Sequence, residues 1–198
     1  MTIRALSGHQ PDRGSPCHQA VGCPYPFPVS DLEIRQTRFG APAARMLVAA
    51  AQADMAARYG SPDQNPVEAL EFDPPEGAFL VAYLGGEPVA CGGWRTLSHF
   101  APGPESNGAT GQPPIAEDVA ELKRMYAAPT VRGMGVAAAL LTALEDSARA
   151  HGMRRIVLET GQLQPEAISF YRKSGYQLIA NYGYYKDEPD CLAFGRDL

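Results

Sequence analysis

The segment APTVRGMGVA, from Ala128 to Ala137, contains residue types suited to binding an anion. Gly133 and Gly135 allow a tight turn and let a ligand approach the backbone without a Cβ in the way. A predicted helix follows, and its first turn offers free N–H groups and the positive end of the helix dipole. The expected guest is a pyrophosphate or a similar group, with a purely structural turn as the alternative.

Two familiar nucleotide-binding patterns do not fit this loop. The dinucleotide pattern Gly-x-Gly-x-x-Gly would need a glycine at position 138, where the chain has Ala138. The chain also lacks the Gly-Lys-Ser/Thr of the P-loop. The anion is therefore expected to belong to another kind of ligand.

Three side chains elsewhere are candidates for acid–base chemistry. Glu121 lies in a predicted strand beside apolar Leu122 and Met125, so an inward-facing carboxylate would have a raised pKa and suit a general base. A solvated, outward-facing Glu121 is the alternative, and Glu159 on a later predicted strand is a weaker candidate for the same role. Tyr171 lies on one face of a predicted helix, where a packing role competes with a chemical one.

Apolar periodicity and turn residues predict the elements that would position these groups. A short strand near Leu32 precedes a helix over 43–59, and strands over 78–84 and 89–97 form a hairpin. Strands and helices then alternate: strand 117–128, helix 133–151, strand 154–160, helix 164–174, and strands 176–180 and 191–194. This order predicts an α/β fold with a mixed sheet and helices on both sides.

The predicted domain spans residues 31–198. Residues 1–30 contain five prolines and no clear periodicity, so we expect a flexible N-terminal arm. Residues 99–114 are rich in Pro, Gly, Ser and Asn, which predicts an exposed loop that could be disordered. No metal is expected, because the spacing of four candidate ligands in the arm matches no zinc site. These ligands are His9, Cys17, His18 and Cys23.

Composition narrows the class of protein. A chain of 198 residues fits one domain, and its net charge of −5 without a Lys/Arg cluster argues against nucleic acid binding. We expect no signal peptide and no membrane span, because the apolar runs are too short. Four scattered cysteines favour a reducing cytoplasm, and Cys91 and Cys191 are expected to be buried small hydrophobes. A homodimer is left open.

Three motifs in this order resemble the GCN5-related N-acetyltransferase (GNAT) family: ELKRMY over Glu121–Tyr126, RGMGVA over Arg132–Ala137 and FYRKSGY over Phe170–Tyr176. The resemblance covers residues 31–198 and is strongest over 117–176. It implies a GNAT-like fold with a splayed central sheet, and acetyl-CoA as the co-substrate. It also implies a cleft between 125–127 and 158–161, where the thioester and the amine meet.

The resemblance also implies roles for individual residues. Backbone amides from Arg132 to Ala137 would hold the acetyl-CoA pyrophosphate, and main-chain groups on both sides of Tyr126 would pair with pantetheine. The Tyr171 hydroxyl would protonate the leaving thiolate, and Glu121 would accept a proton from the amine, directly or through water. Gln164 stands where the family often has an asparagine that contacts CoA. The implied cofactor-binding residues are Met125, Tyr126, Ala127, Arg132, Gly133, Met134, Gly135, Val136, Ala137, Gln164 and Tyr171.

The acceptor side is less defined by the sequence. Five residues could line an acceptor pocket or serve in packing: Trp94, Arg95, Tyr182, Tyr184 and Tyr185. We expect direct transfer, in a ternary complex, of an acetyl group to a primary amine of a small molecule such as an amino acid. Acetylation of a protein lysine or N-terminus is an alternative, and a non-catalytic acyl-CoA-binding sensor is the alternative from another class.

Overall fold

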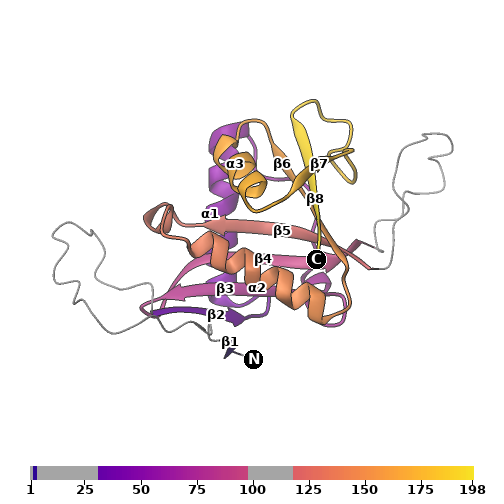
Figure 1. Ribbon diagram of the computed structural model, residues 1–198. Helices are drawn as coiled ribbons and strands as arrows, with labels where there is room; N and C mark the ends of the chain where they lie inside the picture. Colours follow the sequence, from indigo (N-terminus) through magenta and orange to yellow (C-terminus); the bar gives the residue numbers. More distant parts are fainter. Residues whose placement is uncertain (1, 4–30, 98–117) are drawn as a thin grey trace, which may run out of the picture.

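A single mixed sheet forms the centre of the part of the chain that the structure describes (Figure 1). The computed structural model describes residues 2–3, 31–97 and 118–198. The strands lie in the order β1, β2, β3, β4, β5, β6, β8, β7, and neighbours are antiparallel except for β5 and β6. Their bounds are β1 (Thr2–Ile3), β2 (Leu32–Gln36), β3 (Gly77–Leu84), β4 (Glu87–Thr96), β5 (Val119–Ala127), β6 (Arg155–Gly161), β7 (Gln177–Ile179) and β8 (Cys191–Asp197).

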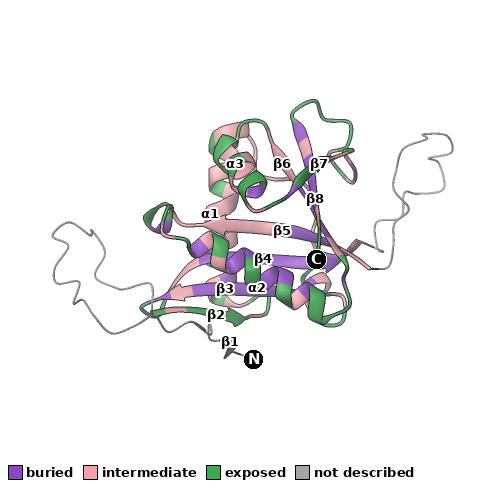
Figure 2. Cartoon of the chain, viewed as in Figure 1, coloured by how far each residue is buried: buried purple, intermediate pink, exposed green. Residues whose placement is uncertain are grey.

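Different helices cover the two faces of this sheet. The helical elements of the described residues include α1 (Pro42–Tyr59), α2 (Val136–Ala150), α3 (Pro165–Lys173) and the short 3-10 turns η2 (Ala69–Phe72) and η4 (Pro129–Val131). Alternate residues of β3 from Ala78 to Leu84 share a buried cluster with α2 and α3, whereas Phe79 and Val81 share one with α1. Because successive strand residues point to opposite faces, α1 lies on one face and α2 and α3 on the other. The predicted α/β fold is confirmed, and Figure 2 shows the buried residues gathered in the central strands and α2.

The start of α2 differs from the prediction. A helix was expected from Gly133, but α2 begins at Val136, after η4 and a turn. Gly133 and Gly135 have left-handed φ values of 79° and 83°, which residues with a Cβ rarely adopt. The glycines therefore shape the entry to the helix and do not belong to it.

Other boundaries agree with the prediction to within a few residues. β5 ends at Ala127, and β8 continues to Asp197, beyond the predicted 191–194. β1 was not predicted, because two residues are too few to show an alternation. The predicted flexibility of the rest of the N-terminal arm and the predicted loop over 99–114 lie outside the described residues.

The two parallel strands at the middle of the sheet separate along their length. β5 and β6 are paired from Val119↔Arg155 to Glu121↔Val157. Beyond these pairs β5 stays on β4 as far as Ala127, and β6 stays on β8 as far as Gly161. The splay that the resemblance implied is therefore present, and it opens between the carboxyl-terminal halves of β5 and β6.

Candidate active site

A cleft of about 470 Å³ lies where β5 and β6 separate. Its walls come from the end of β5, the facing part of β6, the turn before α2, and parts of α1 and α3. Most residues expected at a cofactor site contribute to it: Met125, Tyr126, Ala127, Arg132, Gly133, Gly135, Ala137, Gln164 and Tyr171. The fold thus brings together residues that are up to 46 positions apart in the sequence, from Met125 to Tyr171.

The turn before α2 carries backbone amides that are free to bind an anion. Within the described residues, the first amide of α2 with a backbone acceptor is that of Ala139, which donates to the Gly135 carbonyl at 3.0 Å. The amides of Gly133, Gly135, Val136 and Ala137 precede it and have no backbone acceptor there. Open space also lies where a Cβ of Gly133 or Gly135 would be. This arrangement fits a pyrophosphate at the helix N-terminus.

Arg132 and Met134 contribute in a different way from the prediction. The amides of Arg132 and Met134 each donate to the carbonyl three residues earlier, at 3.3 Å, and so are already used. The Arg132 side chain donates to the Ala127 carbonyl at 3.1 Å and pairs with Asp54 at 2.8 Å. The Val136 side chain is buried in the core, so this residue can offer only its amide.

β5 is irregular beside the cleft. Its pairing with β4 accommodates one extra residue between Lys123 and Tyr126, which is a β-bulge. Arg124 in this bulge has a φ of 56°, a left-handed conformation that is uncommon outside glycine. Its buried side chain forms an ion pair with Asp63 and donates to the Asn65 carbonyl at 2.9 Å. These contacts hold the unfavourable backbone conformation in place.

Tyr171 and Gln164 enter the cleft from α3 and its N-terminus. Tyr171 is buried against Phe170 and Tyr176, with ring centroids 5.2 and 5.5 Å away. Its hydroxyl makes no hydrogen bond with the described residues, and burial raises its pKa above the ordinary value. The hydroxyl therefore stays protonated at neutral pH and is suited to donate a proton. The Gln164 amide nitrogen lies 3.5 Å from the Tyr59 hydroxyl.

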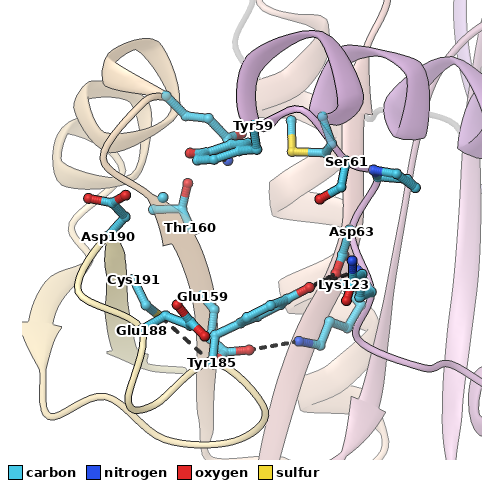
Figure 3. A pocket seen from close by; sticks show the side chains of 15 residues that line it. Tyr59, Ser61, Asp63, Lys123, Glu159, Thr160, Tyr185, Glu188, Asp190 and Cys191 are labelled. Atoms are coloured by element: carbon cyan, nitrogen blue, oxygen red, sulfur yellow. Dashed lines mark hydrogen bonds and ion pairs between the residues drawn. The ribbon is translucent and has the colours of Figure 1, made fainter.

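A second cavity, of about 350 Å³, adjoins the cleft (Figure 3). Six residues line both spaces and mark the place where the two meet: Met55, Asp63, Lys123, Glu159, Thr160 and Gln164. Besides Glu159, the carboxylates of Asp63, Glu188 and Asp190 line the second cavity, against the single cation Lys123. The excess of negative charge suits a ligand that carries an ammonium group.

Tyr185 connects two distant segments of the cavity wall. Its hydroxyl donates to Asp63 Oδ1 at 2.7 Å and accepts hydrogen bonds from the amides of Gln64 and Asn65 at 2.7 and 3.1 Å. Burial and the bond to Asp63 raise the pKa of this phenol to about 12. The segment after α1 and the segment before β8 are thus held against each other.

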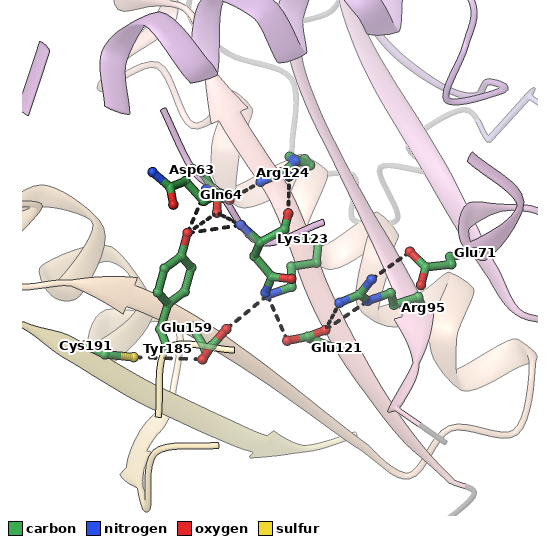
Figure 4. Close-up of polar contacts among 11 residues, drawn as sticks. Asp63, Gln64, Glu71, Arg95, Glu121, Lys123, Arg124, Glu159, Tyr185 and Cys191 are labelled. Carbon is green, nitrogen blue, oxygen red and sulfur yellow. Dashed lines mark hydrogen bonds and ion pairs between the residues drawn. The ribbon is translucent and has the colours of Figure 1, made fainter. Parts of the chain in front are cut away.

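Glu121 lines neither of these two spaces. Its carboxylate is buried 2.9 Å from the Arg95 guanidinium and 2.9 Å from Lys123 Nζ (Figure 4). Arg95 in turn lies 2.6 Å from Glu71. The expected apolar surroundings of Glu121 are therefore wrong, because this carboxylate lies between two cations.

Glu159, and not Glu121, is the buried carboxylate that lines the cleft. Its side chain is 5% exposed, with Oε2 3.0 Å from Lys123 Nζ and Oε1 3.9 Å from Cys191 Sγ. Burial raises the pKa of the Glu159 carboxyl, while the charge of Lys123 opposes this rise. A carboxylate with a raised pKa at the junction of two cavities is suited to accept a proton.

Sequence reasoning missed Lys123 and Asp63. A signal for Lys123 was present, because Glu121 and Lys123 are two residues apart in a strand and so share one face. Asp63 lies in the irregular segment after α1, where local pattern gives no indication of its contacts. Both residues face groups that come from distant parts of the chain.

Of the five residues considered for an acceptor pocket, Tyr185 lines the second cavity. Tyr184 is exposed. The remaining three are buried, which fits the alternative role in packing: Trp94, Arg95 and Tyr182. Both described cysteines are also buried, as expected, and burial raises the pKa of each to about 12.

The described residues contain no group of three or more His, Cys, Asp and Glu side chains that could hold a metal ion. The four candidate ligands in the N-terminal arm lie outside these residues. None of the described helices combines the length and the apolar character needed to cross a bilayer.

Known proteins resemble this chain in sequence and in fold. The sequence profile of the acetyltransferase (GNAT) family matches residues 32–176. An IAA acetyltransferase of Azospirillum brasilense is 36% identical over 124 residues, which are 63% of this chain and 70% of the relative. The uncharacterized N-acetyltransferase YjgM of Escherichia coli (strain K12) is 33% identical over 122 residues, or 61% of this chain and 64% of the relative.

Two solved structures illustrate the likeness in fold. A Klebsiella pneumoniae structure described as an acyl-CoA N-acyltransferase has a TM-score of 0.64 and 26% identity, and the match covers 84% of this chain and 97% of that one. A GNAT acetyltransferase of Elizabethkingia anophelis, with acetyl-CoA bound, has a TM-score of 0.56 and 15% identity over 85% of this chain and 99% of that one. At this lower identity, the second likeness concerns the fold alone.

This chain belongs to the GNAT family of acetyltransferases. The matched residues, 32–176, include all those that line the cleft. The family uses acetyl-CoA as its acetyl donor. The residues of the cleft fit such a donor, because free amides and the Arg132 guanidinium suit its phosphates and the separated edge of β5 suits its extended arm.

Proposed function

We propose that this chain transfers an acetyl group from acetyl-CoA directly to the primary amine of a small molecule, with both substrates bound at once. In this proposal the cleft of about 470 Å³ is the donor cleft, and the cavity of about 350 Å³ is the acceptor cavity. The observation that carries the proposal is the position of Glu159 where the two meet. A donor and an amine that occupy these spaces would meet at this carboxylate.

The donor side would hold acetyl-CoA mainly through main-chain groups. The free amides of Gly133, Gly135, Val136 and Ala137 are suited to its pyrophosphate. Past Glu121, β5 pairs with no strand of the described residues on its β6 side, so its main chain is available to an extended pantetheine arm. When bound, acetyl-CoA supplies the thioester whose acetyl group is transferred.

The acceptor side would hold and deprotonate the amine. A primary alkylamine has a pKa of about 10.4 and arrives as an ammonium ion, which the carboxylates of the cavity attract. Its nitrogen needs a free lone pair before it can attack, and Glu159 is placed to accept the proton that must leave. The Tyr171 hydroxyl, in the donor cleft, holds a proton for the departing sulfur.

The size and walls of the acceptor cavity support a small molecule as the acceptor. Its volume of about 350 Å³ is at the lower end of small-ligand pockets. Tyr185 holds two segments of its wall together through three hydrogen bonds, which supports a pocket of fixed shape. The Azospirillum relative is named as an IAA acetyltransferase, a name that specifies no protein substrate.

The test is thiol release from acetyl-CoA with a panel of small amines and with a lysine-containing peptide. We expect turnover with small amines, and a loss of about 10²- to 10⁴-fold in kcat for Glu159→Gln, because a positioned base contributes this much. Asp146→Asn is the matched control. This carboxylate is exposed on α2 and pairs with Arg149, so kcat should not change.

Two outcomes contradict the proposal. Acetylation of the peptide with no turnover of any small amine would refute a small-molecule acceptor. Parallel lines in a two-substrate analysis would indicate a covalent intermediate, whereas intersecting lines are expected for direct transfer.

A further inference from the structure

Lys123 is a buried cation at the junction of the donor cleft and the acceptor cavity, and the chemistry proposed above does not use it. Its side chain is 7% exposed, and Nζ lies 2.9 Å from Glu121 Oε1 and 3.0 Å from Glu159 Oε2 (Figure 4). The Asn65 amide, oriented by its hydrogen-bond network, places its oxygen 2.8 Å from the same nitrogen. An ammonium group has three N–H donors, so each donor of Lys123 has an acceptor.

This saturation restricts what Lys123 can do. With its three donors used inside the protein, it has none for a substrate carboxylate or for the acetyl carbonyl. Its effect on the reaction must therefore pass through the groups that it contacts. Of these, Glu159 is the one proposed to react.

Glu121 and Glu159 depend on Lys123 to different degrees. Glu121 has a second cation, Arg95, whose guanidinium lies 2.9 Å from Oε2 and also contacts Glu71. For Glu159, Lys123 is the cation within ion-pair distance in the described part of the chain. Removing the charge of Lys123 would leave Glu121 paired but would leave Glu159 buried without a cation.

The remaining surroundings of Glu159 favour its protonated form. Burial and the negative charge of Glu121 both raise the pKa of its carboxyl, and the backbone hydrogen bond from Tyr185 lowers it only as a minor contribution. The nearby Cys191 thiol and Tyr182 hydroxyl have raised pKa values and carry no charge at neutral pH. The other charged groups that line the acceptor cavity are negative: Asp63, Glu188 and Asp190.

We propose that Lys123 is a positioning residue of the reaction, which holds the Glu159 carboxylate ionised and directed at the junction of the donor cleft and the acceptor cavity. This inference rests on the proposed role of Glu159 as the base. A buried ion pair is by itself weak evidence for a contribution to stability. The location of this pair between two substrate cavities indicates a role in the reaction.

The test is the pH dependence of kcat for Lys123→Met and Lys123→Arg in the full chain. The Met side chain keeps a similar length without charge, so we expect the acid limb of the profile to move upward by about one to three pH units. Lys123→Arg restores a cation and should return the limb toward that of the unchanged protein. The dissociation constant of acetyl-CoA should stay within about twofold in both variants, because the amides of the turn before α2 are untouched.

The acid limb of the pH profile distinguishes a positioning role of Lys123 from a purely structural role. A Lys123→Met protein that loses kcat equally at every pH, with its limb unmoved, overturns the proposal. If that variant does not fold, Lys123→Met/Glu121→Gln removes one charge of each sign. A smaller upward shift is then expected, because Lys123 lowers the pKa of Glu159 more than Glu121 raises it. An unmoved limb in the double variant likewise overturns the proposal.

Glu159→Gln separates this inference from the proposed function. If Glu159→Gln keeps both kcat and the acid limb, Glu159 is not the base and both proposals fail. If it abolishes the limb while Lys123→Met leaves the limb in place, the role of Lys123 alone is refuted.

Discussion

Replacing Tyr171 by phenylalanine removes a single hydroxyl and leaves the packing of the ring unchanged. The ring lies against Phe170 and Tyr176, and the hydroxyl makes no hydrogen bond with the described residues. Removal of a hydroxyl without a protein partner breaks no internal hydrogen bond. We therefore expect the free energy of unfolding to change by less than about 1 kcal/mol.

Activity should respond far more strongly than stability. A positioned general acid contributes about 10²- to 10⁴-fold, so kcat should fall by that factor, which corresponds to about 2.7 to 5.4 kcal/mol in the barrier. Because burial raises the pKa of Tyr171, its hydroxyl stays protonated between about pH 6 and pH 9. The loss should therefore be nearly constant over this range in a thiol-release assay at saturating substrates.

Tyr176→Phe is the matched control, since the two rings lie 5.5 Å apart in the same core. The Tyr176 hydroxyl donates to Glu145 Oε1 at 3.0 Å, and losing a bond to a charged acceptor costs about 1.5 to 3 kcal/mol. We expect a melting temperature lower by several degrees and an unchanged kcat. The reasoning is refuted if Tyr171→Phe keeps kcat within about threefold, or if Tyr176→Phe lowers kcat as much as Tyr171→Phe does.

Three further predictions follow from the two sides of the site. Gly135→Ala places a Cβ on a left-handed residue with a φ of 83°, which should lower the free energy of unfolding by about 1 to 2 kcal/mol and weaken acetyl-CoA binding in a titration. Gly152→Ala, at a φ of 87° beyond the other end of α2, is the control and should lower the free energy of unfolding equally without weakening binding. In the unchanged protein, kcat/KM should fall as the pH drops through the raised pKa of Glu159, because the base must be ionised. An acid limb of the pH profile at or below the ordinary pKa of an exposed glutamate would contradict this expectation. An amine with an adjacent carboxylate should react at least about tenfold more slowly than its amide analogue, because the acceptor cavity is negative and the three N–H donors of Lys123 are already used. The difference in rate should shrink at high salt, and equal rates at low salt would contradict this prediction.

The turn of the proposed donor side could be predicted because it is built from local sequence. Two glycines before an apolar helical repeat indicate both a left-handed turn and free amides, and Gly133 and Gly135 have these properties in the structure. The order of strands and helices also follows from local periodicity. The exact first residue of α2 could not be predicted from the local pattern, because the turn and the helix share the same small and apolar residue types.

The proposed acceptor side and the ion pairs beside it could not be predicted, because their residues meet only through the fold. Glu121 was expected in apolar surroundings on the evidence of Leu122 and Met125, yet its cross-strand partner in the register of β4 and β5 is Arg95. Register depends on the whole sheet and is not contained in the neighbours of one residue. Asp63 and Tyr185 are likewise 122 positions apart and meet through a side-chain hydrogen bond.

In the proposed function, acetyl-CoA is held mainly by main-chain groups, whereas the amine meets charged side chains. Substitutions at Asp63, Glu188 or Asp190 alter the charge that an amine meets, yet they leave the amides of the turn before α2 where they are. Under the proposed function, natural selection can change the amine that is acetylated by single substitutions in two short segments, 61–64 and 185–191. The same separation would give protein engineers a place to redirect the proposed enzyme toward new amines while its acetyl donor stays the same.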